Sequence, residues 1–305
     1  MTTAPAPIGI VGASSLVGGC LLERLSAVGA PVFAFTRGPL PADAGPVRWR
    51  PLASAPGGDG PVPDWIVLAP VWTVESLFGL MESAGARRVI ALSSTSRFTK
   101  AGSSSASERE IAQALTRGED ALARWADARG VRAVVLRPTL IYGRDADGNV
   151  AAIARLVRRF GVFPVLGDAL GLRQPVHCDD VADACLRALR AHDPARAYEL
   201  SGAEVLTYRT MVERVFAALG RRPRIVRLPM VAFRAAIQVA RLLPGRRGWT
   251  PAMAERMNRD MAFAHDEASR DLGFAPRPFR LEPRDLPGAA HRPAPASTTI
   301  AQRTR

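Results

Sequence analysis

The feature that most constrains the fold lies at the start of the chain, where PIGIVGASSLVGG joins a short apolar run to a helical pattern through a glycine-containing loop. The first turn of such a helix presents free N–H groups and the positive end of its dipole. Gly12 permits a tight turn at the strand end, and Gly18 lets the helix pack closely on a sheet. Ser15 stands where a third glycine is common, and its hydroxyl can donate to phosphate. The pattern therefore predicts a dinucleotide site formed by Gly12, Ser14, Ser15, Leu16, Val17 and Gly18.

Behind this loop, apolar runs alternate with helical patterns along the first half of the chain. Such alternation indicates right-handed crossovers and a parallel sheet covered by helices on both faces. The predicted strands are 7–13, 31–37, 47–52, 64–70, 87–94 and 131–143. We therefore expect an α/β fold with a doubly wound, Rossmann-type parallel sheet in residues 1–143.

The second half has a more mixed pattern. Residues 144–283 are expected to complete the sheet and to form a smaller C-terminal substrate lobe. Residues 284–305 are rich in Pro, Ala and Arg without periodicity, which predicts a disordered tail. The segment 229–244 predicts an amphipathic helix packed on the core, with a membrane-surface helix as the alternative.

Composition excludes several classes of protein. The chain has 305 residues and a formal net charge of +13, but its arginines are scattered rather than gathered in a basic run interleaved with aromatics. We therefore expect no nucleic-acid partner. The three cysteines have neither disulfide-framework nor CxxC spacing, no signal peptide is evident, and no apolar run is long enough for a membrane span. A cytoplasmic protein without a metal site is the resulting prediction.

The end of the second predicted strand bears on the choice of cofactor. NAD sites commonly place an acid there, which accepts from the ribose 2′-hydroxyl. This strand ends in Thr36 and Arg37 instead, and a guanidinium can pair with a 2′-phosphate. The sequence favours NADP over NAD, unless Arg37 is simply a solvated strand end.

Several segments, in this order, resemble the extended short-chain dehydrogenase/reductase superfamily, in its NAD(P)-dependent epimerase/dehydratase branch. They are IVGASSLVG, DWIVLAPV, VIALSSTS, LRPTLIYG, RQPVHCDDVADA and DLGFAPRPF. The resemblance implies that Thr95 is the substrate-facing hydroxyl and that Arg173 binds a substrate diphosphate. It also implies that the cofactor is lined by Leu68, Ala69, Pro70, Ser93, Ser94 and Pro138.

One element of that family is missing. Its members carry a helical Tyr-x-x-x-Lys pair that moves the proton, whereas here the only lysine, Lys100, precedes all three tyrosines. By position, the pair would fall on Ile111 and Leu115, and Glu119 matches a glutamate that often follows.

Two functional readings stay open. In the first, the chain is an NAD(P)-dependent oxidoreductase or epimerase/dehydratase that acts on a sugar-nucleotide-like or other carbonyl or carbinol substrate through a non-standard acid/base. Candidate groups are Lys100, Glu108, Glu110 and His177. In the second, it is a catalytically silent NADP(H)-binding regulatory, redox-sensing or assembly protein. We expect a small-molecule, phosphorylated partner in the first case and leave open whether the chain forms a homodimer.

Overall fold

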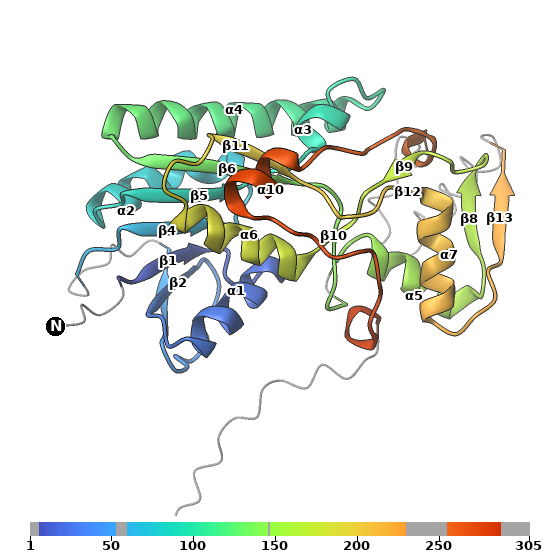
Figure 1. Cartoon of the computed structure of the whole chain (residues 1–305), viewed down its shortest axis with the longest axis horizontal. Helices are drawn as coiled ribbons and strands as arrows, with labels where there is room; N and C mark the ends of the chain where they lie inside the picture. The colour runs from blue at the N-terminus through green and yellow to red at the C-terminus, as the bar shows by residue number, and fades with distance from the viewer. Residues whose placement is uncertain (1–5, 53–59, 146, 230–254, 288–305) are drawn as a thin grey trace, which may run out of the picture.

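A seven-stranded parallel sheet forms the centre of the protein (Figure 1). The computed structural model describes residues 6–52, 60–145, 147–229 and 255–287. The strands of the sheet are β1 (Ile8–Val11), β2 (Val32–Thr36), β3 (Val47–Pro51), β4 (Asp64–Val67), β5 (Arg88–Leu92), β6 (Arg132–Pro138) and β11 (Ala197–Leu200). All pairings are parallel, in the order β11-β6-β5-β4-β1-β2-β3. The chain thus winds outward from β1 in one direction and then from β4 in the other, which confirms the predicted doubly wound fold.

Helices cover both faces of this sheet. On one face lie α1 (Leu16–Ala27) and α6 (Cys178–Arg190), and on the other lie α4 (Ala106–Arg129), η1 (Val71–Leu77) and α2 (Phe78–Ser83) (Figure 1). Each face has its own apolar core. Because central strands are buried on both sides, their side chains are apolar at nearly every position, as the burial of all four residues of β1 and of β4 shows.

A smaller lobe lies beyond one end of the sheet (Figure 1). It is built from α5 (Val150–Phe160), β8 (Phe163–Leu166), α7 (Tyr208–Ala218) and β13 (Ile225–Leu228), which enclose a third apolar core. The shorter elements are α3 (Ser96–Thr99), β7 (Ile141–Tyr142), β9 (Leu172–Arg173), β10 (Val176–His177), β12 (Leu206–Thr207), η2 (Arg256–Asn258), α10 (Asp266–Leu272) and η3 (Pro283–Asp285). The four elements of the lobe come from residues 150–228, within the segment where the sequence analysis places a substrate lobe.

The C-terminal segment differs from the sequence-based expectation. The disordered tail was expected to begin at residue 284, yet residues 285–287 are buried against the protein. Asp285 is 1% exposed, accepts from the Arg144 backbone N–H at 3.0 Å and lies 3.3 Å from His177 Nε2. Residues 288–305 lie outside the described part of the chain, and so does nearly all of the predicted helix at 229–244. Among the described residues, no helix is long and apolar enough to cross a membrane.

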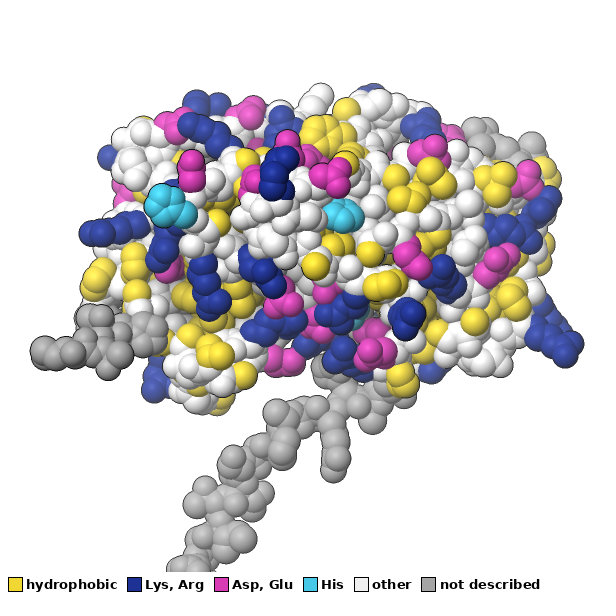
Figure 2. All heavy atoms as spheres, in the orientation of Figure 1, with side chains coloured by type: hydrophobic (Ala, Val, Ile, Leu, Met, Phe, Trp, Pro, Cys, Tyr) yellow, Lys and Arg dark blue, Asp and Glu magenta, His cyan; other side chains and the backbone are white. Residues whose placement is uncertain are grey.

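Charge is mixed on the face of the molecule drawn in Figure 2. Arginine side chains are interspersed there with Asp and Glu rather than gathered into one basic surface. Many of the arginines form ion pairs, for example Arg24 with Asp183 and Arg88 with Asp64. The excess positive charge is therefore distributed over this face.

Candidate functional site

The predicted phosphate loop has the geometry that its glycines require. Gly12 has φ +84°, and a Cβ atom there would lie 3.0 Å from the Ala69 backbone nitrogen. At Gly18 a Cβ atom would lie 2.4 Å from the Ala13 carbonyl oxygen. Gly18 is therefore closed to a side chain by this backbone contact, whereas at Gly12 the left-handed φ together with a tight contact disfavours one.

Ser15 takes part in the loop as a helix cap. Its Oγ accepts a hydrogen bond from the Gly18 N–H at 3.1 Å, and its own hydroxyl hydrogen remains available to a ligand. Ser14 and Ser15 are exposed, Leu16 is half-buried and Val17 is buried. The start of α1 thus combines exposed hydroxyls with the free N–H groups of a helix N-terminus.

The carboxyl ends of the neighbouring strands continue this edge of the sheet. Leu68 donates its N–H to the Val11 carbonyl at 2.8 Å, which places the residues after β4 beside the loop after β1. Leu68 and Ala69 are half-buried, and Pro70 is exposed. Arg37 is exposed directly after β2. In open α/β sheets, ligands bind in the crevice outside this edge, at the point where the strand order reverses.

Thr95 and Pro138 meet at the ends of β5 and β6. The Thr95 N–H and Oγ1 both donate to the Pro138 carbonyl, at 3.1 and 3.2 Å, and both residues are buried. The hydroxyl of Thr95 is therefore held in a fixed position, with its lone pairs available to a hydroxyl donor. Ser94 is half-buried beside it.

The Ser93 hydroxyl is instead engaged with Glu119, the acid that sequence position had singled out in the long helix. Ser93 Oγ donates to Glu119 at 2.5 Å. Arg97 also pairs with this carboxylate, and Arg137 donates to it through two nitrogens at 3.0 and 2.6 Å. Glu119 is 4% exposed. We call Ser93, Arg97, Glu119 and Arg137 the Glu119 cluster; it fixes the loop that carries Ser94 and Thr95.

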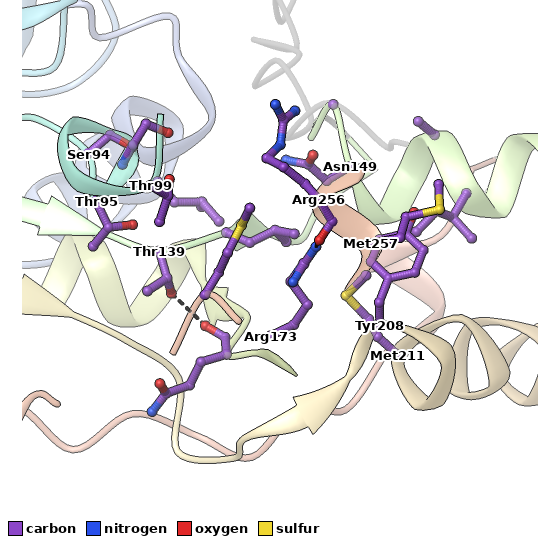
Figure 3. A pocket seen from close by; sticks show the side chains of 18 of the residues that line it. Ser94, Thr95, Thr99, Thr139, Asn149, Arg173, Tyr208, Met211, Arg256 and Met257 are labelled. Atoms are coloured by element: carbon purple, nitrogen blue, oxygen red, sulfur yellow. Dashed lines mark hydrogen bonds between the residues drawn. The ribbon is translucent and has the colours of Figure 1, made fainter. Parts of the chain in front are cut away.

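A cavity of about 480 Å³ opens between this loop and the second lobe (Figure 3). On one side lie Ser94, Thr95, Thr99 and Thr139. The opposite side carries Asn149, Tyr208, Met211, Arg256 and Met257. The volume suits a small molecule, and the lining combines apolar side chains with a few hydroxyl, amide and cationic groups.

Lys100 lines the same cavity and is half-buried. Among the described residues, no carboxylate is paired with its ammonium group. Burial, and then the nearby positive charge of Arg256, lower the pKa of Lys100 below that of an ordinary lysine. A lower pKa makes this ammonium group a better proton donor than that of an ordinary lysine.

Arg173 also borders the cavity, but its guanidinium already has partners. It donates to the carbonyls of Leu172 at 2.6 Å, Arg259 at 2.9 Å and Arg256, and it lies over the Tyr208 ring at 5.2 Å. The residue is 5% exposed, and burial lowers its pKa. Its position thus orders the turn that carries Arg256, which also lines the cavity and pairs with Glu108.

The remaining acid/base candidates do not border this cavity. His177 is buried and caps α6, where its Nδ1 accepts from the Asp179 N–H at 3.1 Å. Glu108 is buried, accepts from Ser103 at 2.7 Å and pairs with Arg256. Glu110 is exposed on α4. The structure therefore brings together Thr95 and Lys100, but not these three.

The two positions at which the sequence analysis places the missing pair lie in apolar surroundings. Leu115 is buried and Ile111 packs against the same apolar core beneath the sheet. Of the tyrosines, only Tyr208 lines the cavity, since Tyr142 donates to the Arg280 carbonyl at 3.4 Å and Tyr198 to Asp271 at 3.1 Å.

Sequence reasoning missed several cavity residues, notably Thr139, Asn149, Tyr208 and Arg256. Thr139 follows Pro138 directly, so its position beside the site could have been inferred. Asn149, Tyr208 and Arg256 come from three separate segments of the second lobe, and no local pattern in the sequence marks them as neighbours.

Comparison with known proteins shows what part of the chain resembles a known family and which fold it shares. Residues 71–201 match the model of the NAD dependent epimerase/dehydratase family. The protein y4nG of Sinorhizobium fredii (strain NBRC 101917 / NGR234), which is uncharacterized, is 31% identical over 148 residues, or 48% of this chain and 37% of that protein. The mitochondrial NADH dehydrogenase [ubiquinone] 1 alpha subcomplex subunit 9 of Arabidopsis thaliana is 30% identical over 99 residues, covering 32% and 24%. The chain thus matches well under half the length of either relative.

Solved structures resemble the chain over most of its length. A putative epimerase from Burkholderia cenocepacia J2315 has a TM-score of 0.66 at 17% identity and covers 90% of this chain and 95% of its own. UDP-glucuronic acid 4-epimerase from Bacillus cereus, in complex with NAD, has a TM-score of 0.65 at 14% identity, with 92% and 95% covered. MoeE5 in complex with UDP-glucose and NAD has a TM-score of 0.63 at 21% identity, with 90% and 94% covered. At these identities the likeness concerns the fold. The chain therefore has the fold of these epimerases and, over residues 71–201, matches the model of the NAD dependent epimerase/dehydratase family.

Proposed function

We propose that the protein is an NAD(P)-dependent oxidoreductase or epimerase that acts on a sugar-nucleotide-like or other carbonyl or carbinol substrate. The observation that carries this proposal is the common cavity of Thr95 and Lys100 at the carboxyl edge of the sheet, in line with the loop at Gly12 and Gly18. The family match at residues 71–201 and the NAD held by MoeE5 and by the B. cereus epimerase support the same cofactor class.

Different residues of the chain would bind the different parts of a dinucleotide. The start of α1, with Ser14 and Ser15, would hold the pyrophosphate, and Leu68, Ala69 and Pro70 would border the cofactor along β4. A bound nicotinamide would supply hydride transfer at its C4 carbon. Arg37 follows β2 directly and would pair with a 2′-phosphate there, which favours NADP(H) over NAD(H).

Thr95 and Lys100 would handle the proton of the substrate. Thr95 Oγ1 donates to Pro138, so its lone pairs can accept from a substrate hydroxyl and orient it. Neutral Lys100 would take the hydroxyl proton as the C–H hydride leaves, and its ammonium form would return a proton to the oxygen in the reverse direction. Arg256 would contribute positive charge toward an anionic part of the substrate, which suits a phosphorylated molecule.

Cofactor binding can be tested with two adjacent glycines. Gly18→Ala places a methyl group 2.4 Å from the Ala13 carbonyl oxygen and should weaken NADH and NADPH binding about tenfold or more, a loss of about 1.4 kcal/mol or more. Gly19→Ala is the matched control, because nothing lies within 4 Å of its Cβ position. Fluorescence titration measures both. Equal affinities in the two variants and the parent chain would remove the phosphate loop from the proposal.

Turnover can be tested by following NAD(P)H absorbance with nucleotide sugars and small carbonyl compounds. Lys100→Met should lower turnover about a hundredfold or more while NAD(P)H still binds, because general acid–base groups commonly contribute that much. Thr95→Val should lower it as well, since the methyl group cannot accept the substrate hydrogen bond. Undiminished turnover in Lys100→Met would exclude this lysine as the proton donor.

A second candidate function rests on the absent Tyr-x-x-x-Lys pair and the aliphatic residues at its place. In it the protein binds NADP(H) without turning it over and serves a regulatory, redox-sensing or assembly role. The local likeness to a subunit of mitochondrial NADH dehydrogenase is consistent with such a role. Saturable NADPH binding with no turnover across sugar nucleotides and quinones would favour this function over catalysis.

A further inference from the structure

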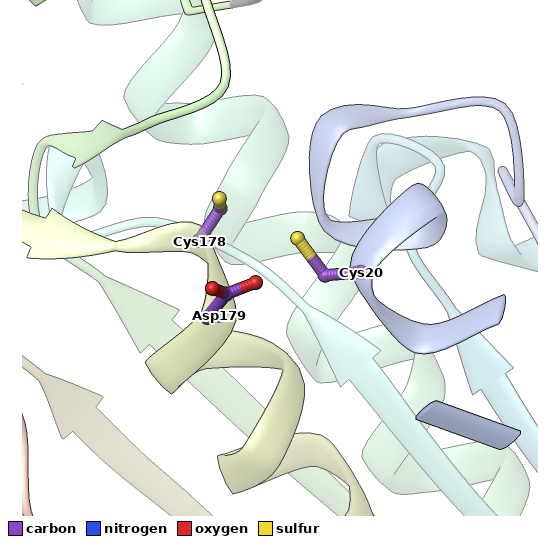
Figure 4. A group of neighbouring side chains, drawn as sticks. All are labelled: Cys20, Cys178 and Asp179. Atoms are coloured by element: carbon purple, nitrogen blue, oxygen red, sulfur yellow. The ribbon is translucent and has the colours of Figure 1, made fainter. Parts of the chain in front are cut away.

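Two cysteines far apart in the sequence meet between the helices on one face of the sheet (Figure 4). Cys20 lies in α1, two residues after Gly18, and Cys178 is the first residue of α6. Their sulfur atoms and a carboxylate oxygen of Asp179 all lie within 4.8 Å of one another, and the Cys20 thiol points toward Cys178. Both cysteines are free and fully buried. Neither belongs to the cavity described above.

The surroundings make the two thiols chemically unequal. A hydrogen bond from Cys20, together with His177, whose Nδ1 lies 4.0 Å from Cys178 Sγ, lowers the pKa of Cys178. Its position in the first turn of α6 acts in the same direction. The pKa of Cys20 is raised by the same hydrogen bond and by burial. Cys178 is thus the thiolate of the pair, and Cys20 keeps its proton.

The cluster of Cys20, Cys178 and Asp179 could bind a metal ion, or its two thiols could react with each other. The charges around Asp179 distinguish these alternatives. Arg24 and Arg144 lie 3.2 and 2.9 Å from one oxygen of Asp179, and Arg277 and Arg284 each lie 3.7 Å from the other. A divalent cation coordinated by this carboxylate would face four guanidinium groups. The same positive charge favours a thiolate, so the cluster fits sulfur chemistry better than metal binding.

We propose that Cys20 and Cys178 are a modification site at which a peroxide converts the two thiols into a disulfide joining α1 to α6. The Cys178 thiolate attacks one oxygen of hydrogen peroxide, which breaks the O–O bond, forms a sulfenic acid and releases hydroxide. Cys20 sulfur then attacks Cys178 sulfur; the S–S bond forms and water leaves with the Cys20 proton. Two thiols lose two electrons and the peroxide gains them. The bond fixes the helix that follows the phosphate loop to its neighbour.

Both thiols are shielded from solvent, so oxidation requires a brief separation of α1 and α6 and proceeds more slowly than at an exposed cysteine. The test treats the folded protein with hydrogen peroxide, alkylates the remaining thiols after denaturation and measures the intact mass. The expected product has lost two hydrogens, keeps one alkylatable thiol and yields a peptide linking Cys20 to Cys178. Dithiothreitol should restore all three thiols, and the oxidised form should unfold at a higher temperature.

Three variants complete the experiment. Cys20→Ser and Cys178→Ser should not form the linked peptide, whereas Cys185→Ser should form it as the parent chain does. Cys185 is the matched control because it is equally buried in α6, outside the cluster, and burial raises its pKa to about 12. Cys20→Ala serves if a serine at this position prevents folding. A parent chain that keeps three thiols under peroxide, or one that carries a zinc ion lost in both cysteine variants, would overturn the proposal.

Discussion

Replacement of Glu119 should be costly, because this single buried carboxylate pairs with two guanidinium groups. Replacement by Gln keeps the shape of the side chain but removes its charge. Ser93 donates to one carboxylate oxygen of Glu119, and Arg97 and Arg137 donate to the other. In the Gln variant the amide NH₂ group can face Ser93, whose hydroxyl can also accept, so both guanidinium groups keep an oxygen but lose the negative charge that they pair with.

The magnitude follows from the burial of the three charged groups. Removing one partner of a fully buried ion pair costs about 3–5 kcal/mol. The Glu119 side chain is 3% exposed, but those of Arg97 and Arg137 are 23% and 17% exposed, so water relieves part of their loss. Arg137 also retains Glu199 at 3.0 Å. We therefore expect Glu119→Gln to lower the free energy of unfolding by about 2–4 kcal/mol.

Urea denaturation followed by tryptophan fluorescence measures this difference. Glu110→Gln is the matched control, because Glu110 lies on the same helix α4 but is exposed, and its replacement should stay within about 0.5 kcal/mol of the parent. Glu119→Gln should also weaken turnover, because the loop carrying Thr95 loses its anchor. If Glu119→Gln were as stable as Glu110→Gln, the Glu119 cluster would not be the support of this loop.

The other predictions concern charge at the candidate site and beneath it. Arg37→Ala should weaken NADPH binding about tenfold and leave NADH binding nearly unchanged, as titrations with both cofactors can show. In a pH–rate profile, the change in rate that follows the titration of Lys100 should occur below the pKa of an ordinary lysine. Arg256→Met should move this change to higher pH, because the positive charge of Arg256 contributes to the lowered pKa. Burial alone would raise the pKa of Asp179, but Cys20 and Arg144 outweigh it and lower it. Its ion pairs therefore stabilise the fold fully above the unfolded-state pKa of about 3.9 and lose this contribution as the pH falls, so Asp179→Asn should flatten the acid side of a stability profile measured by urea denaturation.

The fold could be predicted from local patterns because the central strands are buried on both sides. A run such as DWIV, which forms β4, can be recognised as a strand without its neighbours, and the glycine loop that follows β1 can be recognised in the same way. Gly12 and Gly18 could be assigned their roles from spacing alone, since each is required by a backbone contact a few residues away or on an adjacent strand. Features that depend on contacts between nearby residues can thus be predicted from the sequence.

The cavity could be predicted only in part, because one side follows from a local sequence motif and the other from the packing of distant segments. Thr95 follows β5 and was identified from its local motif. Arg256 and Tyr208 reach the cavity through the packing of the second lobe, which depends on contacts between segments with no common pattern. The ordered turn at Asp285 was missed for the same reason: composition indicated a tail, whereas a buried carboxylate between Arg144 and His177 holds it to the protein.

In our proposal, Lys100 takes the place of the missing proton relay. By the family resemblance that relay would fall on Ile111 and Leu115 of α4, and both side chains pack into the apolar core against the sheet. An aliphatic pair there adds to that core and carries no group that can move a proton. The loop after β5 supplies the replacement in our proposal, because α3 ends at Thr99 and its C-cap residue Lys100 lines the cavity. Restoring only Ile111→Tyr would add a phenol without the lysine one turn later that lowers its pKa, so it should not rescue the turnover lost in Lys100→Met.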